Sequence, residues 1–438
     1  MTETKNKMKR ILFCIGLILA LPSEAQEDSF YQLQYREKVL HYNQDIKAAD
    51  YQVSMRTEMT QSARADFLPK LSADADFKYT GNPLQLTRTV GDMPISFEGR
   101  NIHYGGSLTL AQPIYMGGSL QAAYRKTLQE KSLAEQERRR ILNNIAYDAD
   151  VHYWNAVAGR EMVGVAAEYK KAVSRLVTVV KHRVEVEYID KNDLLMAEVK
   201  LNEADYQWLQ AINQAEVSNL ALYSFAGLET NEDLSTDSIV VALKQGMTEI
   251  PDVMAALEQR PEMQIARSQV GIQESTGKIA NAQYLPKISV GFNGSYSSPG
   301  YDFTSDLDPN YAVYAKVSIP LYEWGKRKNT RHASRYQIQT AQENQQKIED
   351  QVRLEIETAY YTFTQSIDQV RLTESSLQKA AESERMAMDK YREGRISIVE
   401  VINAQLYHQQ AKVNYIQSKL NAQVARSSYH RVTCSFTL

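Results

Sequence analysis

Short motifs recur in the same order in the two halves of this chain, and this duplication limits the folds that are open to it. The sequence ADFLPK at 65–70 returns as AQYLPK at 282–287, and PIYMGG at 113–118 returns as PLYEWG at 320–325. A chain with such repeats is expected to fold as two copies of one structural unit. The two motifs lie closer together in the second copy than in the first, which predicts a longer loop between them in the first copy.

Two stretches in each half alternate between apolar and polar residues, which is typical of strands with one apolar face. They predict two β-hairpins, at about residues 70–113 and about residues 287–320, and therefore four strands. Gly, Pro, Asn and Asp residues mark the loop inside each hairpin. The residues expected on the apolar faces include Leu71, Phe77, Leu108, Val290, Phe292 and Val317.

Long stretches with little Gly or Pro follow each hairpin, and this composition favours long helices. As one helix, the segment from Gly118 to Asp190 would span roughly 108 Å at about 1.5 Å per residue. The return segment from Asp190 to Gly227 is only about half as long. An opening helix from Ser29 to about Asp66 is therefore expected to cover the other half of the long helix. We predict a mainly α-helical, internally duplicated fold with a small β part.

The N-terminus has the pattern of a secretory signal. Basic residues precede an apolar run from Ile11 to Leu21, and Ser23-Glu24-Ala25 follows, with the expected cut after Ala25. The run is well short of the roughly twenty residues that a membrane-spanning helix needs. Cys14 lies too early in the run to be a good lipid acceptor. The expected division is a signal peptide at 1–25, a first repeat at 26–228, a linker at 229–250 and a second repeat at 251–438.

Charge and reactive residues exclude several classes of function. The net charge is −3 and the basic residues are spread along the chain, which is unlike a nucleic-acid-binding protein. Without the signal, Cys434 is the only cysteine, so neither an internal disulfide nor a cysteine metal site is expected. The sequence has no nucleophile elbow, phosphate-binding loop or helical histidine pair. We therefore expect no enzyme activity, no cofactor and no metal.

The strands imply assembly. Four strands cannot close a barrel, and an open sheet edge in lipid leaves backbone groups without hydrogen bonds. Three copies would supply twelve strands, which is within the range of outer-membrane barrels. The apolar faces would then contact outer-membrane lipid, and the helices would continue the pore as a tube in the periplasm. The main alternative is a structural periplasmic coiled-coil protein without channel activity, which the long helices alone would allow.

The chain resembles the TolC-like outer-membrane efflux family over nearly its whole mature length. The resemblance rests on the duplicated motifs given above and on two turns, EYIDKNDLLMA at 187–197 and GRISIVEVINA at 394–404. It implies a homotrimer with a twelve-stranded barrel and a helical tunnel. It also implies a periplasmic adaptor of the membrane-fusion type that joins the tunnel to an inner-membrane pump. The pump would drive small molecules or polypeptides through a passive duct, and the sequence does not distinguish drugs, metals and polypeptides as cargo.

The same resemblance suggests residues that close the periplasmic tip, namely Asp193, Tyr391, Arg395 and Glu400. Three features depart from the family pattern: Glu187 stands where glycine is usual, Arg395 lies one place early, and Asn403 replaces an acid. Simpler roles stay open, because Ser397 and Glu400 have the spacing of a capping box and Asp193 has the same spacing from Asp190. Arg395 has the alternative of an ordinary solvated charge.

Overall fold

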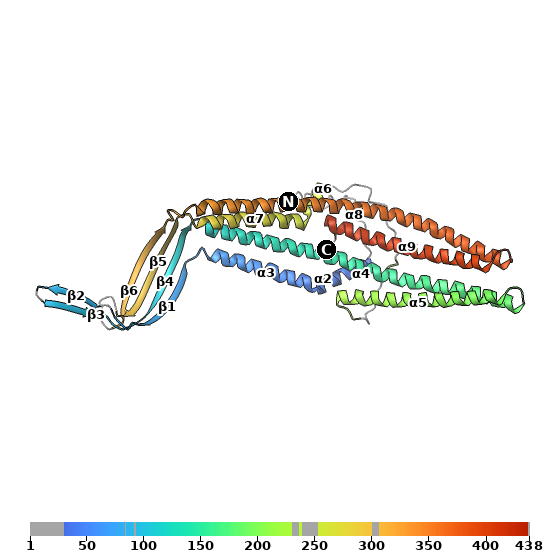
Figure 1. Cartoon of the computed structure of the whole chain (residues 1–438), viewed down its shortest axis with the longest axis horizontal. Helices are drawn as coiled ribbons and strands as arrows, with labels where there is room; N and C mark the ends of the chain where they lie inside the picture. The colour runs from blue at the N-terminus through green and yellow to red at the C-terminus, as the bar shows by residue number, and fades with distance from the viewer. Residues whose placement is uncertain are drawn as a thin grey trace, which may run out of the picture.

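The computed structural model describes residues 30–83, 85–91, 93–229, 236–238, 253–299 and 306–436. The expected signal peptide and most of the expected linker lie outside these residues. The molecule is elongated, with a β-sheet near one end and helices that run away from it to the other end (Figure 1). Within the described residues, no helix is both long enough and apolar enough to cross a membrane.

Each half contributes the same order of elements. The first half contains α2 (Phe30–Tyr42), α3 (Gln44–Ala65), β1 (Lys70–Tyr79), β2 (Gln85–Val90), β3 (Met93–Glu98), β4 (Ile102–Met116), α4 (Ser119–Glu185) and α5 (Lys191–Ala226). The second half contains α6 (Val253–Gln259), α7 (Pro261–Ala282), β5 (Lys287–Ser298), β6 (Asp308–Ser318), α8 (Lys326–Arg392) and α9 (Ile398–Thr433).

The predicted duplication is confirmed in the bounds of the helices. Both α4 and α8 have 67 residues, and both α5 and α9 have 36. Both α3 and α7 have 22 residues. The two longest helices each begin after a glycine, Gly118 or Gly325, whose φ is 80°. That left-handed conformation is strained for other residues, which explains why the glycine recurs.

The opening helix was predicted as one piece, and the structure corrects this to two. The side chain of Asn43 accepts hydrogen bonds from the backbone N–H groups of Asp45, at 2.9 Å, and Ile46, at 3.4 Å. Its ψ of 130° is not helical. Asn is a favoured N-cap residue, so the chain ends α2 and starts α3 at this position.

The main sheet joins the two predicted hairpins side by side. Its strand order is β1-β4-β5-β6, and all its neighbours are antiparallel. Strands β4 and β5 bring the two halves of the chain together, and the side chain of Asn293 donates a hydrogen bond to Thr109 across them at 2.8 Å. Strands β1 and β6 are the edges.

Two details of the strands differ from the prediction. The longer first loop is itself a hairpin of β2 and β3, which extends beyond the main sheet in Figure 1. A signal for it was present, since Gly91-Asp92 is a two-residue turn sequence between two β-prone runs. Strand β4 also continues past Pro113 to Met116, with a register shift between Pro113 and Tyr115. Proline has no N–H and cannot donate to a regular strand ladder. It is tolerated where the register shifts, because that position is not required to donate a hydrogen bond.

The helices form a layer whose order changes along the molecule. Next to the sheet, α4 and α7 lie between α3 and α8. Farther away, α4 and α9 lie between α5 and α8. In both parts α8 is at one edge, and the opposite edge is formed by α3 or α5. Two short helices therefore cover each long one, as the length argument predicted.

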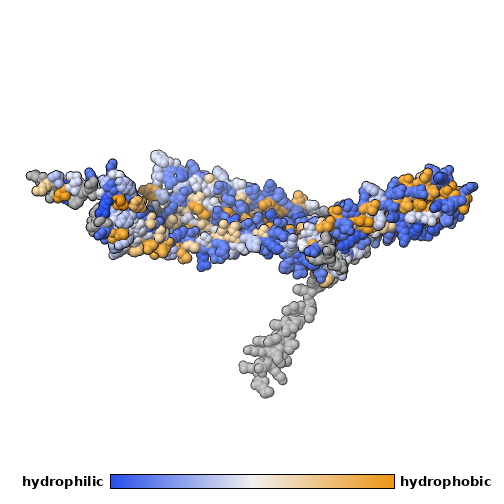
Figure 2. Space-filling view, turned by 90° about the horizontal axis from the view of Figure 1, so that it is seen from below, coloured by the Kyte–Doolittle hydropathy of each residue, from blue (hydrophilic) through white to orange (hydrophobic). Residues whose placement is uncertain are grey.

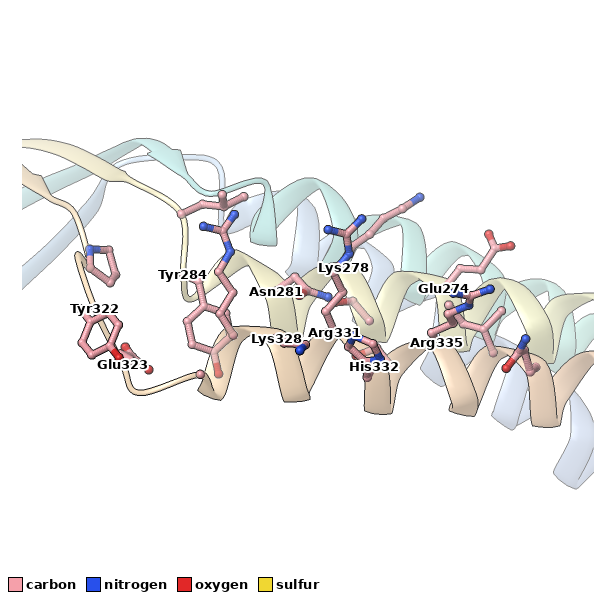
Figure 3. A pocket seen from close by; sticks show the side chains of 18 of the residues that line it. Glu274, Lys278, Asn281, Tyr284, Tyr322, Glu323, Lys328, Arg331, His332 and Arg335 are labelled. Carbon is pink, nitrogen blue, oxygen red and sulfur yellow. The ribbon is translucent and has the colours of Figure 1, made fainter.

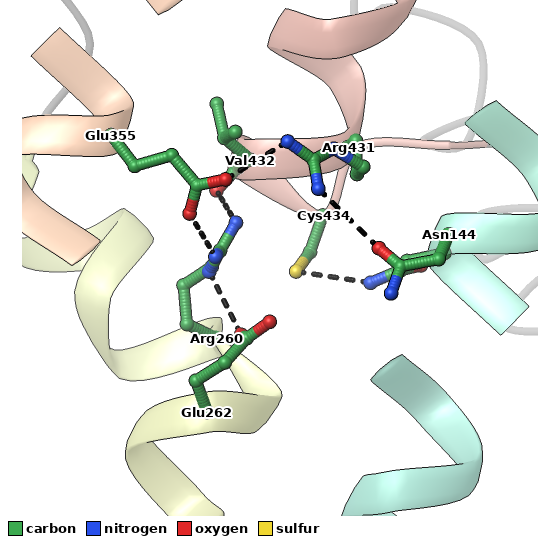
Figure 4. Close-up of polar contacts among 8 residues, drawn as sticks. Asn144, Arg260, Glu262, Glu355, Arg431, Val432 and Cys434 are labelled. Carbon is green, nitrogen blue, oxygen red and sulfur yellow. Dashed lines mark hydrogen bonds and ion pairs between the residues drawn. The ribbon is translucent and has the colours of Figure 1, made fainter. Parts of the chain in front are cut away.

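Buried polar groups join the helices where the short ones meet. The guanidinium of Arg36 on α2 forms an ion pair with Asp150 on α4 at 2.9 Å, and both side chains are at most 2% exposed. Ser427 on α9 donates to the same carboxylate at 2.7 Å. A second group, shown in Figure 4, links Arg260 at the start of α7 to Glu355 on α8 at 2.5 Å. Such partnered charges fix the register of the helices, because a single unpaired charge would be costly to bury.

Candidate functional site

The strand register gathers the predicted apolar residues on one face of the main sheet. Leu71 pairs with Leu110, Leu110 with Phe292, and Phe292 with Val313. Residues that pair across strands point to the same side, and so do residues two apart on one strand. All six residues proposed from the sequence therefore share this face: Leu71, Phe77, Leu108, Val290, Phe292 and Val317. Their exposed fractions run from 37% to 73%, so none of the described residues of the protomer covers this face.

The other face of the sheet is polar. Ser72 pairs with Thr109, and Thr109 pairs with Asn293. Asp74, Asp76 and Lys78 of β1 lie on the same side as Ser72, because they follow it at intervals of two. The apolar face of the sheet thus suits an apolar environment, and the polar face suits water.

The tip farthest from the sheet is made of two equivalent turns. The first joins α4 to α5 and has Glu187 at a φ of 55°, and the second joins α8 to α9 and has Gly394 at a φ of 75°. In the first turn the N–H of Tyr188 bonds the carbonyl of Arg183, and in the second the N–H of Arg395 bonds the carbonyl of Lys390, both at 2.9 Å. The departure from glycine at Glu187 therefore leaves the turn geometry unchanged.

A first prediction follows from this turn. A non-glycine residue in the left-handed region costs about 1 kcal/mol relative to glycine. Glu187→Gly is therefore expected to stabilise the protein by less than about 1 kcal/mol, because the extra entropy that glycine loses on folding offsets about 0.4 to 1 kcal/mol of the gain. Chemical unfolding of the parent and the variant measures the difference. Lower stability of the variant would show that the Glu187 side chain makes a compensating contact.

Tyr391 lies in an apolar cluster that joins the two helical hairpins at the tip. It is 2% exposed and packs with Val180 of α4 and Val401 of α9. Burial raises the pKa of the Tyr391 hydroxyl, the charge of Arg183 lowers it, and the charge of Asp193 raises it. The charge of Asp193 therefore acts on the Tyr391 hydroxyl. No hydrogen bond links it to Tyr391, whose hydroxyl has no partner that satisfies hydrogen-bond geometry in the described part of the chain.

Arg183, on α4, was not identified from the sequence, yet it bridges the two hairpins. Its guanidinium carbon lies 4.6 Å from the centre of the Tyr391 ring and 5.3 Å from that of Tyr188. Its Nη2 also donates to the backbone carbonyl of Arg392 at 2.8 Å. A cation over an aromatic face, together with a charge-assisted hydrogen bond, makes a specific link between the first hairpin and the second.

The other two candidates at the tip have local contacts. The Glu400 carboxylate accepts the backbone N–H of Ser397 at 3.3 Å, as in a capping box at the start of α9. Arg395 is paired with Glu393 at 3.0 Å, and its side chain is 72% exposed. Asp190, and not Asp193, caps α5, since its side chain accepts the N–H of Asn192 at 2.7 Å. Of the four tip candidates, Tyr391 thus lies in the apolar cluster, Asp193 acts on its hydroxyl through charge, and Arg395 and Glu400 have local partners.

The cap of α9 gives a second prediction. Glu400→Ala is expected to lower the free energy of unfolding by about 0.5 to 1 kcal/mol, because it removes one half of the capping box. Glu400→Gln should retain the bond, since the amide oxygen can still accept. Thermal unfolding followed by circular dichroism compares the two variants. An equal loss of stability in both variants would mean that the charge of Glu400 matters and that its hydrogen bond to Ser397 does not.

A groove beside Glu400 adds apolar surface at the tip. It lies between α8 and α9 and is lined by residues that include Met386, Ile396 and Tyr407. Tyr407 is 70% exposed. Figure 2 shows apolar residues gathered over this end of the molecule. Among the described residues, no group of three or more His, Cys, Asp or Glu side chains is placed to hold a metal ion.

The duplicated helices, the two-faced sheet and the tip agree with a family comparison. The family model described as outer membrane efflux protein matches residues 36–228 and 253–429. The chain belongs to this family. The two matched segments correspond to the two halves seen in the structure, and membership places this efflux protein in the outer membrane. Its family is one of transport ducts.

Solved structures of outer-membrane channels have the same fold as this efflux protein. CusC superposes with a TM-score of 0.81 at 16% identity, and the match covers 95% of each chain. CmeC of Campylobacter jejuni gives a TM-score of 0.77 at 17% identity, covering 94% of this chain and 90% of that one. The open state of MtrE from Neisseria gonorrhoeae gives 0.77 at 15% identity, covering 92% and 88%. Comparison with curated proteins gave no match.

Proposed function

We propose that this protein is the outer-membrane duct of a tripartite efflux or type I secretion machine. Three copies would form a channel that crosses the outer membrane as a twelve-stranded barrel and continues through the periplasm as a helical tunnel. Cargo would pass passively, driven by an inner-membrane pump and guided by a periplasmic adaptor. In this proposal residues 26–228 and 251–438 act as two equivalent repeats within each protomer.

The observation that carries the proposal is the open sheet. Strands β1 and β6 each have a neighbour on one side only, and the sheet's apolar face is exposed. In lipid, each unpaired backbone group costs several kcal/mol, so the edges must be satisfied by another copy. Pairing β6 of one protomer with β1 of the next satisfies both edges and closes the sheet when three copies meet.

Helix length supports the periplasmic part of the proposal. The 67 residues of α4 and of α8 correspond to roughly 100 Å at about 1.5 Å per residue. A tube of that length carries the tip far from the outer membrane, toward the pump. The apolar groove at the tip, with Met386 and Tyr407, is a suitable contact for an adaptor.

Two measurements test the proposal. Detergent-solubilised protein should have about three times the mass of one chain, and chemical cross-linking should stop at three. The same trimers should conduct ions in planar bilayers. A monomer recovered in a detergent-free soluble extract would instead support the structural coiled-coil alternative.

A further inference from the structure

A large groove lies where the helices meet the sheet, far from the tip. It has a volume of about 1440 Å³ and lies between the end of α7, the segment 320–325 and the first turns of α8. Figure 3 shows its side chains, which include Lys278 from α7 and Arg331 and Arg335 from α8. We call it the basic groove, and define it by five cationic residues: Lys278, Arg327, Lys328, Arg331 and Arg335.

The positive charge of the basic groove is not neutralised. Its five cationic residues face two carboxylates, Glu274 and Glu323, which leaves a net charge of +3 (5 − 2). The Oε2 atom of Glu323 lies 3.9 Å from the Nζ atom of Lys326, a residue that does not line the groove. Across the described part of the chain, none of the five side chains forms an ion pair or hydrogen bond. Unpaired cations that converge on one hollow attract an anion.

The duplication provides an internal control for this charge. When Gly118 is aligned with Gly325, the positions of Arg327, Lys328, Arg331 and Arg335 are occupied in α4 by Leu120, Gln121, Tyr124 and Leu128. From Lys326 to Arg335 the chain has five Lys or Arg residues and no Asp or Glu. The start of a long helix therefore does not require cations here. An ordinary solvated face would also carry both signs of charge.

The depth of the groove points to its ligand. A membrane strand needs about 9 to 11 residues, and β5 and β6 have 12 and 11. The segment between β6 and α8 therefore lies at the membrane surface. Leu321, Tyr322 and Trp324 in this segment are 92%, 72% and 88% exposed, as expected of an interfacial aromatic belt. The basic groove begins within a turn of them, at the level of lipid phosphates.

We propose that the basic groove binds the phosphate of a phospholipid headgroup in the periplasmic leaflet of the outer membrane. The inference rests on the proposed barrel, which sets the depth of the groove. Lys328, Arg331 and Arg335 contact the phosphate, and Leu321 and Tyr322 lie beside the start of the acyl chains. One lipid per protomer would anchor the edge helix α8 at the membrane surface.

A neighbouring protomer is the competing occupant, because α8 is an edge helix. The part of α3 that would lie at this depth in the next copy carries Arg56, Glu58 and Arg64. Arg56 is already paired with Glu130 at 3.0 Å. Asp66, just beyond α3, is paired with Lys70 at 2.8 Å. Among the described residues at this depth of the edge, Glu58 is the carboxylate without an ion pair, so the neighbouring copy would bring one negative charge against the net charge of +3 in the groove.

The test compares two triple variants that remove the same charge from α8. The first is Lys328→Gln, Arg331→Gln and Arg335→Gln. The matched control is Lys347→Gln, Arg353→Gln and Arg371→Gln, three positions farther along the same helix. Native mass spectrometry counts the phosphatidylglycerol and phosphatidylcholine molecules retained per trimer, with and without millimolar inorganic phosphate.

Parent and control should retain up to three phosphatidylglycerol molecules per trimer, and inorganic phosphate should not displace them. The groove variant should bind this lipid about a hundredfold more weakly, because each of the three basic residues near an anionic lipid contributes about a factor of five. Equal retention in all three proteins would overturn the proposal. Displacement by inorganic phosphate would indicate a free-phosphate site, and loss of the trimer with unchanged lipid binding would assign the groove to a neighbouring copy. Absence of trimers in the parent would contradict the proposed function instead.

Discussion

Arg183→Gln is expected to raise the conductance of reconstituted trimers in planar bilayers, because it removes the link between the two hairpins at the tip. The link combines the contact with the Tyr391 ring and the hydrogen bond to the Arg392 carbonyl. Arg183 is partly exposed, so we assign the link about 1 to 2 kcal/mol per protomer. Three protomers that open together would lose about 3 to 6 kcal/mol. A change of about 5.5 kcal/mol moves an equilibrium from 1:99 to 99:1.

Two further variants make this experiment specific. Arg175→Gln removes the same side chain two turns away on α4, where it bonds only the Lys171 carbonyl of its own helix, and should conduct like the parent. Asp193→Asn removes the charge that lies near Tyr391 while keeping a short polar side chain. If Asp193 also holds the tip, its variant should conduct more than the parent. Parental conductance of an intact Arg183→Gln trimer would show that this contact does not close the tip.

Periodicity and duplication were sufficient to predict most of the fold. The constant spacing between matching residues of the two halves predicts that α8 and α9 repeat α4 and α5, and the helix bounds agree residue for residue. The sequence also predicted which residues lie on each face of a strand, because alternate residues of a strand point to the same side. The break at Asn43 was missed because a single capping side chain decided it, against an otherwise continuous helical pattern.

The tip shows the limit of motif reasoning. Tyr391 and Asp193 were proposed from the resemblance of the two turn segments to a known family, which is information along one chain segment. Arg183 acts through contacts with residues in the other half of the chain, such as Tyr391. No periodicity marks such a residue, because its role depends on how two hairpins pack. Its counterpart in the repeat, Lys390, could not have indicated the contact with an aromatic ring.

Edge position explains why the two halves differ despite their common fold. Helix α4 is covered on both sides along its length, whereas α8 lies at an edge. Leu120 on the covered helix is partly buried, whereas Arg327 and Arg335 on the edge helix are exposed. Duplication thus supplies the architecture, and divergence at the edge supplies the basic groove that we propose binds a lipid.

Phe292→Arg is expected to destabilise the assembled channel by about 2 to 4 kcal/mol per protomer, the cost of an arginine on the lipid face near the bilayer midplane. Phe292 is near the middle of β5, on the face shared with Leu71 and Val317. Urea unfolding of trimers in lipid vesicles measures the loss. Assembly itself should fail if the cost in three protomers exceeds the stability of the trimer.

Two control variants separate charge from other effects of this change. Phe292→Ala removes the ring without adding charge. Its smaller loss of trimer stability therefore measures the contribution of side-chain size. Ser295→Arg places the same charge on the opposite face of β5, toward the polar side shared with Asn293. Water on that side should leave the charge solvated, and the trimer should retain nearly its full stability. If Phe292→Arg and Ser295→Arg were equally well tolerated, the apolar face would not contact lipid, and the closed barrel would lose its main physical support.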